Sequence, residues 1–493
     1  MRNISNYFLC LCLLALFACS EDNLDLRPGS ITEANFYQSE TDFERGVIGV
    51  YAKMSDIYWF NSNDPMHGFW QLPGDDMTTT GGVSFEVFDN LNPTTGFVSR
   101  YYDQMYQMLN RANTVLEKLD EESEIYTTSG LKDHHRGEVT FLRGWVNFQL
   151  WNYYGTSPLI TQRVRLEDVE DGGFANASAN ALLDQAIMDF QAAAGLLPDS
   201  WPSTDLGRVT SNSANGMLAK ALVFRASATG QNADYTAAIA AADAITSRSL
   251  VANFGDNFNA QTENNEESLF EFQASQATSD NVWLSNDFST GANGSMSAYW
   301  GYYDNHWSLF GKPRFQATGK FIAALEADDP RIPFTVDPET RNVLKYVVDN
   351  QFTDAGVGSA NNPRILRLAD VMLLKAEAIV QSGGSTDAAL AIVNEIRARA
   401  NAMVDSTDAP LPIAIGGQTA AEAMDIIRNE RMIELFGEGG HRWLDLRRWH
   451  LGGQIDLAQW DFDSDRDDFN IELPKNLNYP IPLAEVDLNP NVT

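Results

Sequence analysis

The stretch RILRLADVMLLKAEAIVQSG, residues 364–383, carries the apolar pattern of an α-helix. Its apolar residues recur at steps of three and four: Leu366, Ala369, Leu373, Ala376 and Val380. This spacing places the side chains on one face of a helix, and that face must pack against another element. A pair of glycines at 383–384 marks the end, because glycine accepts the backbone conformation found there.

Seven further segments read as helices in the same way. They span residues 101–119, 134–155, 179–197, 210–228, 234–247, 386–401 and 421–439. Several of their faces are rich in alanine, which lets helices approach closely. Helix pairs of this length resemble tetratricopeptide repeats. We therefore predict a mostly α fold, an α-superhelix of tetratricopeptide-like helix pairs with long irregular loop regions.

Two regions break the helical pattern, residues 57–100 and residues 251–362. They are rich in Asn, Pro, Gly, Thr and aromatic residues, and the first four of these types favour turns or loops over helices. Loops of such length within a compact chain are usually functional or disordered, and the aromatic content argues against disorder. We therefore expect a ligand site in these loops.

The N-terminus has the pattern of an exported lipoprotein. The apolar run FLCLCLLALFA, residues 8–18, is too short for a stable membrane span but suits the core of a signal peptide. A small residue, Ala18, precedes Cys19 at its end and resembles a bacterial lipoprotein cleavage site, so Cys19 is the predicted lipidated residue. An ordinary secretory signal with an incidental cysteine is the alternative. The acidic SED at residues 20–22 resembles the signal that sends some Bacteroidetes lipoproteins to the outer face of the outer membrane.

Cysteine content and charge narrow the function further. All three cysteines lie at or before Cys19, so we expect no disulfide, thiolate nucleophile or cysteine metal site in the exported protein. The net charge of −33 argues against nucleic acid, whose binding needs a basic surface. It also mildly disfavours polyanionic glycans, which leaves neutral ligands as the expectation.

The most distinctive segment is RNERMIELFGEGGHRWLDLRRWH, residues 428–450, where acids and arginines alternate over two predicted helices. One interpretation makes Glu438, His441 and Asp445 a metal or acid–base cluster. The other makes the segment a buried lattice of arginine–carboxylate pairs that locks the two helices together. The sequence favours the lattice, because cations crowd the acids and compete with a metal.

This segment resembles the signature of the SusD/RagB family of outer-membrane lipoproteins. Five further stretches match that family in order and placement, so the resemblance covers most of the chain after the signal peptide. They lie at residues 141–160, 207–226, 321–332, 366–379 and 479–491. One departure is YGTSPLI, residues 154–160, where the family usually has an acidic residue after the glycine.

The resemblance implies an α-superhelix that docks on a TonB-dependent SusC-type transporter of the outer membrane. It also implies variable loops that bind a nutrient, usually an oligosaccharide and sometimes a peptide, without catalysis. We divide the chain into a signal peptide (1–18), a lipid-anchored tether (19–30), an N-terminal helical-repeat region (31–250, with the inserted loop 57–100) and a C-terminal RagB/SusD region (251–493, with the aromatic loop region 251–362). The family's binding residues have no fixed motif, so candidates must come from composition.

The stretch SMSAYWGYYDNHW, residues 295–307, supplies most of the candidates, because it packs five aromatic residues among small and polar ones. Flat rings match the apolar faces of a neutral sugar, and Asn or Asp side chains can meet its hydroxyls. The predicted ligand-binding residues are Trp70, Trp283, Tyr299, Trp300, Tyr303, Asp304, Asn305 and Trp307. The alternative is that some of these rings form core beneath a long loop.

Two acidic patterns carry weaker hypotheses. DFDSDRDDFNIE, residues 461–472, has acids at calcium-loop positions from Asp461 to Glu472, but Arg466 replaces the glycine that such a loop requires. We favour a solvated acidic turn, with calcium as the open alternative and no other cofactor. Asp75 and Asp76 form a carboxylate pair, but adjacent residues point apart, whereas glycosidases need two carboxylates that face each other across a sugar. We therefore predict no enzyme activity.

Three functions compete at this point. The first is a cell-surface lipoprotein that captures oligosaccharides, neutral ones by preference, and delivers them to a SusC-type transporter. The second is a peptide-binding member of the same family, which neighbouring peptidase genes would favour. The third is a secreted helical glycoside hydrolase, which product formation from a glycan would reveal.

Overall fold

The structure is a computed structural model that describes residues 36–58, 60–61, 64–79, 84–89, 91–121, 123–170, 173–274, 296–300, 302–303, 315–347, 359–404, 411–462 and 469–492. The predicted signal peptide and tether, with Cys19, lie outside these residues. Lipidation of Cys19 therefore stays a prediction.

The chain is mostly helical, as predicted. The longer helices are α3 (Glu40–Tyr51), α7 (Gly96–Glu121), α8 (Leu131–Tyr154), α10 (Ala181–Leu196), α11 (Ser211–Thr229), α12 (Asn232–Asp243), α17 (Leu368–Gln381), α18 (Thr386–Asn401), α19 (Ala420–Glu434) and α20 (His441–Leu451). The shorter ones are α4 (Met54–Ile57), α5 (Met66–Gln71), α6 (Ser84–Val87), α9 (Leu166–Glu170), α14 (Ser297–Trp300), α15 (Gly319–Ala324), α16 (Ile332–Thr335) and α21 (Leu483–Leu488), with 3₁₀ turns at Ser123–Ile125, Ser203–Asp205, Phe254–Phe258 and Lys475–Leu477. Across the described ranges, every helix is too short or too polar to cross a membrane.

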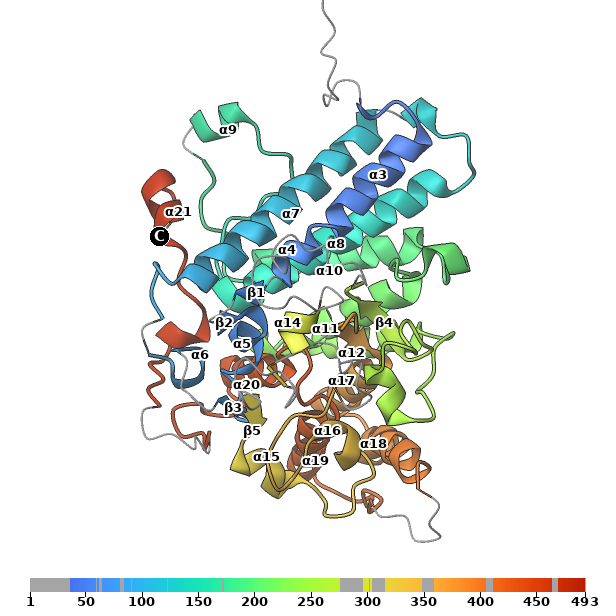
Figure 1. Cartoon of the computed structure of the whole chain (residues 1–493), viewed down its shortest axis with the longest axis vertical. Helices are drawn as coiled ribbons and strands as arrows, with labels where there is room; N and C mark the ends of the chain where they lie inside the picture. Colours follow the sequence, from blue (N-terminus) through green and yellow to red (C-terminus); the bar gives the residue numbers. More distant parts are fainter. Residues whose placement is uncertain are drawn as a thin grey trace, which may run out of the picture.

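The long helices pack on one another in chain order, α7 on α8, α8 on α10, α10 on α11, α11 on α12 and α12 on α17. The last of these, α17, then packs against both α18 and α19. Figure 1 shows the succession as a stack that runs from α3, α7 and α8 at one end to α18 and α19 at the other. Small residues allow the close approach, because a methyl group at Gly144 on α8 would lie 2.9 Å from Cβ of Asp189 on α10. The helical superhelix is thus confirmed.

The segment 364–383, predicted to be one helix, begins with a strand. Residues Arg364–Arg367 form the strand β6, and the helix α17 begins only at Leu368. The strand pairs antiparallel with β4 (Ser268–Glu271), with Glu271 opposite Arg364. The prediction of helix from residue 364 was wrong, because a strand forms only where a partner is present and this partner lies far away in the sequence.

Two short ladders position the irregular regions. β1 (Phe60–Asn61) pairs with β2 (Asp64–Pro65), and β3 (Met77–Thr79) pairs antiparallel with β5 (Phe315–Ala317). Since β3 belongs to the first irregular region and β5 to the second, this pairing brings the two regions side by side.

The predicted lattice of arginines and carboxylates is confirmed, and it extends beyond two helices. The carboxylate of Glu434 on α19 lies at its centre and accepts hydrogen bonds from three guanidinium groups. The donors are Arg399 of α18 at 2.5 Å, Arg367 of β6 at 2.7 Å and Arg331 at 2.8 Å. All four side chains are buried, so the lattice ties segments remote in sequence into one core.

Glu438, His441 and Asp445, the residues of the alternative metal cluster, all contact basic side chains. Asp445 accepts hydrogen bonds from Arg431 at 2.8 Å and Arg448 at 2.9 Å, and Glu438 is paired with a lysine and an arginine. His441 lies beside the ammonium group of Lys220, at 3.0 Å. Within the described ranges, no group of three or more His, Cys, Asp and Glu side chains is placed to hold a metal ion.

Candidate ligand-binding site

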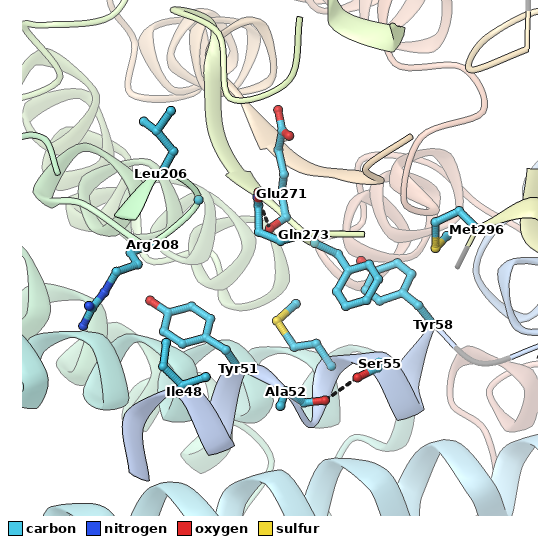
Figure 2. Close-up of a pocket in the computed structure, with 13 residues that line it drawn as sticks. Ile48, Tyr51, Ala52, Ser55, Tyr58, Leu206, Arg208, Glu271, Gln273 and Met296 are labelled. Carbon is cyan, nitrogen blue, oxygen red and sulfur yellow. Dashed lines mark hydrogen bonds between the residues drawn. The ribbon is translucent and has the colours of Figure 1, made fainter. Parts of the chain in front are cut away.

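A cavity of about 350 Å³ lies where α3 and α4 face the loop 206–208 and the end of β4. Figure 2 shows the side chains that surround it. They are Ile48, Tyr51, Ala52, Met54, Ser55, Tyr58, Leu206, Gly207, Arg208, Glu271, Phe272, Gln273 and Met296. Met296 begins the short segment that leads into α14, so the cavity lies at the border of the predicted aromatic loops.

One end of the cavity is formed by stacked aromatic rings. The rings of Tyr58 and Phe272 are nearly parallel, at 14°, with their centroids 4.7 Å apart. Trp70 supports Tyr58 from behind in an edge contact at 5.2 Å. Phe272 is only half-buried, so ring surface stays available to a ligand that presents an apolar face.

The opposite wall is polar, and its arginine is paired with carboxylates. Arg208 donates hydrogen bonds to Glu44 and Glu138, each with a closest distance of 2.5 Å. Tyr51 donates to Glu138 at 2.9 Å and accepts the backbone N–H of Val209 at 3.1 Å, which fixes its hydroxyl. Burial, followed by the charge of Glu138, raises the pKa of Tyr51 well above its ordinary value, so the hydroxyl stays protonated. The charged groups of this wall are therefore satisfied by one another.

Gly207 shapes the rim of the cavity. Its backbone has φ of +93°, and a Cβ there would lie 2.3 Å from the side chain of Gln273. Only glycine fits this conformation and this close approach without strain. Gln273 is itself held by paired hydrogen bonds with Asn264, at 2.9 and 3.0 Å. The rim thus places a fixed amide beside the apolar wall, and a second cavity of about 260 Å³ continues beyond Gly207.

Comparison with known proteins identifies the family. The model of the SusD family matches residues 250–493. A second model, described as starch-binding associating with outer membrane, matches residues 22–222. The chain belongs to the SusD/RagB family.

Relatives in the SusD/RagB family align with nearly the whole chain. A SusD-like protein of Formosa agariphila is 24% identical, over 97% of this chain and 95% of its own. A SusD superfamily protein from Bacteroides vulgatus of known crystal structure is 23% identical over 93% of this chain and 99% of its own, with a TM-score of 0.72. A solved laminarin-binding SusD-like protein is 23% identical over the same shares, with a TM-score of 0.71. These likenesses establish the SusD fold.

Within the SusD fold, four of the predicted ligand-binding rings lie in the core. Trp70, Tyr299, Trp300 and Tyr303 are all buried. Trp300 stacks on Tyr346 with centroids 3.9 Å apart, and its indole N–H donates to the carbonyl of Asn361 at 2.8 Å. Tyr303 donates its hydroxyl to Gln71. The expectation that these four face solvent is therefore corrected, because other side chains cover the ring faces that a sugar would need.

The other predicted ligand-binding residues lie outside the described residues. These are Trp283, Asp304, Asn305 and Trp307. The acidic stretch proposed for calcium is also described only in part, since residues 463–468 fall outside. The ligand role of these residues and the calcium alternative both stay predictions.

The cavity residues that composition alone missed are Tyr51, Arg208 and Phe272. Tyr51 ends the helix α3, where an aromatic residue is usually part of the core. Arg208 precedes the helix α11, where a polar residue usually lies on the surface. Phe272 follows the strand β4. This strand was not predicted, because its partner, residues 364–367, was assigned to a helix. The glycine before Arg208 was the one local signal, because an isolated glycine can mark a close approach of the backbone.

The carboxylate pair Asp75 and Asp76 is buried and serves structure. Asp75 pairs with Arg442 at 2.5 Å and with Lys320 at 2.8 Å, while the indole N–H of Trp460 donates to it at 2.9 Å. The cavity beside Asp76 measures about 10 Å³, which is too small for a sugar ring. The two carboxylates therefore do not face each other across a substrate space.

Replacing Asp76 with asparagine is expected to stabilise the protein at alkaline pH. Burial and the charge of Asp75 raise the pKa of Asp76 from 3.8 to about 7. In the unfolded chain this carboxyl ionises near 3.8, whereas in the folded protein it stays protonated up to about 7. The free energy of unfolding of wild type therefore falls as pH rises between these two values, and it stays lower above them. Thermal unfolding should show Asp76→Asn melting above wild type at pH about 8 and much less so near pH 4.

Asp75→Asn is the matched control with the opposite sign. Burial alone would raise the pKa of Asp75, but the charges of Arg442 and Lys320 outweigh it and lower that pKa. Its ionised form therefore stabilises the fold at neutral and alkaline pH, and Asp75→Asn should melt below wild type there. Equal shifts for both variants at both pH values would contradict the assignment.

Proposed function

We propose that this SusD-family chain is a cell-surface lipoprotein, without catalytic activity, that captures neutral oligosaccharides and delivers them to a TonB-dependent SusC-type transporter. The observation that carries the proposal is the cavity of Figure 2, where stacked rings face a polar wall whose arginine is already paired with carboxylates. The starch-binding description of the matching family and the laminarin-binding neighbour support a glycan as the ligand.

The chemistry of the cavity favours a ligand without charge. A neutral sugar ring has apolar C–H faces that suit the half-buried ring of Phe272, and its hydroxyls suit the amide of Gln273 and the hydroxyl of Ser55. The arginine at the wall already has two carboxylate partners, so it offers little to an anionic sugar. The predicted ligand role of Trp283, Trp307, Asp304 and Asn305 is part of this proposal and is tested with it.

Calorimetry with laminarin oligosaccharides tests the proposal. We expect Phe272→Ala to weaken binding by about 2 kcal/mol or more, the usual size for a central anchor, and Trp283→Ala combined with Trp307→Ala to do the same. Phe174→Ala is the matched control, because this half-buried ring lines a different cavity. If the Phe272 variant and the double variant both bind with wild-type affinity and unfold at the wild-type temperature, the oligosaccharide does not bind at the proposed site.

The two alternatives give different results with the same protein. A glycoside hydrolase would release product from the glycan during incubation, whereas a binding protein returns it intact. A peptide-binding relative would take up peptides and leave the oligosaccharide unbound. We favour binding over hydrolysis because Glu271 is the one carboxylate among the described residues that line the cavity, whereas glycoside hydrolysis uses two.

Replacing Cys19 with alanine is expected to remove the membrane anchor. The predicted lipid is attached through the thiol of Cys19, so the variant should be recovered unprocessed or as soluble periplasmic protein. Fractionation and protease treatment of whole cells measure the change. Cys12→Ala is the control, because it lies within the apolar run of the signal and should leave lipidation intact. A Cys19 variant that still pellets with outer membranes and stays accessible from outside would refute the lipid anchor.

A further inference from the structure

A separate cavity of about 480 Å³ lies between α7, the segment 158–174 and the C-terminal residues 485–492. We name it the α7–α21 groove. Figure 1 shows α9 and α21 beside α7, where they flank this part of the molecule. The groove shares no lining residue with the cavity of Figure 2, and it is the larger of the two. Nothing in the proposed glycan capture uses it.

The walls of the groove are aromatic and are tied together by hydrogen bonds. The rings of Tyr102 and Tyr106 are in contact, with centroids 4.7 Å apart. The hydroxyl of Tyr106 donates to the carbonyl of Pro158 at 2.7 Å. The amide of Asn489 donates to the carbonyl of Phe174 at 2.7 Å, which joins the C-terminal residues to the opposite wall. The groove is therefore built by fixed partners and does not need a ligand to form.

Two carboxylates supply the charge of the groove, Asp103 on α7 and Glu485 on α21. Within the part of the chain that the structure describes, neither makes a hydrogen bond or an ion pair through its side chain. Arg100 and Lys53 attract the Asp103 charge from outside, since neither lines the groove. Burial raises the pKa of both carboxyl groups, and the charge of Asp103 raises that of Glu485 further. A cation placed in the groove would relieve this repulsion.

We propose that the α7–α21 groove binds an organic ammonium group that is attached to an apolar body. The carboxylates accept the hydrogen bonds of the ammonium, and the half-buried ring of Tyr106 attracts its charge. The apolar walls remove the body of the ligand from water. A neutral sugar would bring no positive charge to the two carboxylates, and an anion would be repelled by them. The proposal does not depend on glycan binding at the other cavity.

The ammonium group can belong to a free amine or to a lysine side chain within a peptide. Val169 and Leu488 line the groove, with exposed fractions of 58% and 82%, and extend its apolar surface outward. Both sources present the same chemistry to Asp103 and Glu485. Two probes distinguish them, phenylbutylammonium for the free amine and acetyl-Leu-Lys-Leu-amide for the peptide.

Calorimetry on the exported protein at neutral pH and low salt tests the proposal. We expect the ammonium probe to bind at least about tenfold more tightly than phenylbutanol, which has the same body without the charge. Asp103→Asn and Glu485→Gln should each weaken binding about fivefold, and the double variant more than either. Glu395→Gln is the control, because this exposed acid on α18 is remote from the groove.

The binding of the two ammonium probes and of phenylbutanol gives the possible outcomes. Tighter binding of either ammonium probe, lost in the double variant, supports the groove, and the probe that binds identifies the source. Failure of both probes, equal binding of phenylbutanol, or full binding by the double variant overturns the proposal, provided thermal unfolding is unchanged. Phe272→Ala should leave ammonium binding intact, and the double variant should leave laminarin binding intact, so the two proposed sites fail or stand separately.

Discussion

Replacing Glu434 with alanine is expected to lower the free energy of unfolding by about 3–5 kcal/mol, the usual effect of removing one member of a buried ion pair. Three guanidinium groups, from Arg331, Arg367 and Arg399, donate to this carboxylate within 2.8 Å. They are buried, so the variant leaves positive charges close together without their shared anion and away from water. Urea unfolding measures the loss as a lower midpoint.

Glu395→Ala is the matched control for this prediction. Glu395 lies exposed on α18, and its removal should change the free energy of unfolding by no more than about 0.5 kcal/mol. If the Glu434 variant were as stable as this control, the lattice would contribute nothing to the fold.

The acid sensitivity of wild type should agree with the Glu434 result. Burial acts to raise the pKa of Glu434, but Arg399, Arg367 and Arg331 outweigh it and lower that pKa. The stabilisation is therefore complete above the ordinary range of a glutamate and is lost as pH falls through the lowered folded value.

Replacing Trp300 with alanine is expected to cost about 3–5 kcal/mol of unfolding free energy, because it empties a large buried site. The indole is 2% exposed, stacks on Tyr346 and donates to the carbonyl of Asn361. The variant therefore loses ring contacts and leaves a buried carbonyl short of a donor. Thermal and urea unfolding measure the loss.

Trp300→Phe separates packing from the hydrogen bond. It keeps most of the ring contact with Tyr346 but not the donor, so we expect a loss of about 1–3 kcal/mol, smaller than for alanine. Laminarin affinity per folded molecule should stay close to wild type. Unchanged stability in Trp300→Ala together with lost glycan binding would contradict the placement of this ring in the core.

The helices could be predicted because their signal is local. Steps of three and four along α17, α7 or α8 reveal a buried face within a few turns of chain. The lattice could also be predicted in kind, since residues 428–450 place arginines so close to the acids that these cations compete with a metal. The extent of the lattice could not be predicted, because Arg331 and Arg367 come from segments far from Glu434 in the sequence.

The candidate site was predictable only as a region. Composition indicated that the two irregular regions were rich in rings, but it carried no information on which ring faces would be covered. The pairing of β3 with β5 and the packing of Tyr58 on Phe272 decide that question, and both join residues more than 200 positions apart. Half of the named site residues, Trp70 and the three rings of α14 and its end, therefore belong to the core.

The amino-acid sequence by itself determined the helical class and the SusD/RagB family, because both depend on patterns within short runs of residues. It also predicts the export signal, which stays a prediction. Tertiary structure alone decided which aromatic rings are core, which strand pairs with residues 364–367, and that Asp103 and Glu485 line one groove. The physical reason is that burial and charge repulsion depend on neighbours in space. Those neighbours come from distant parts of the chain, and no local pattern records them.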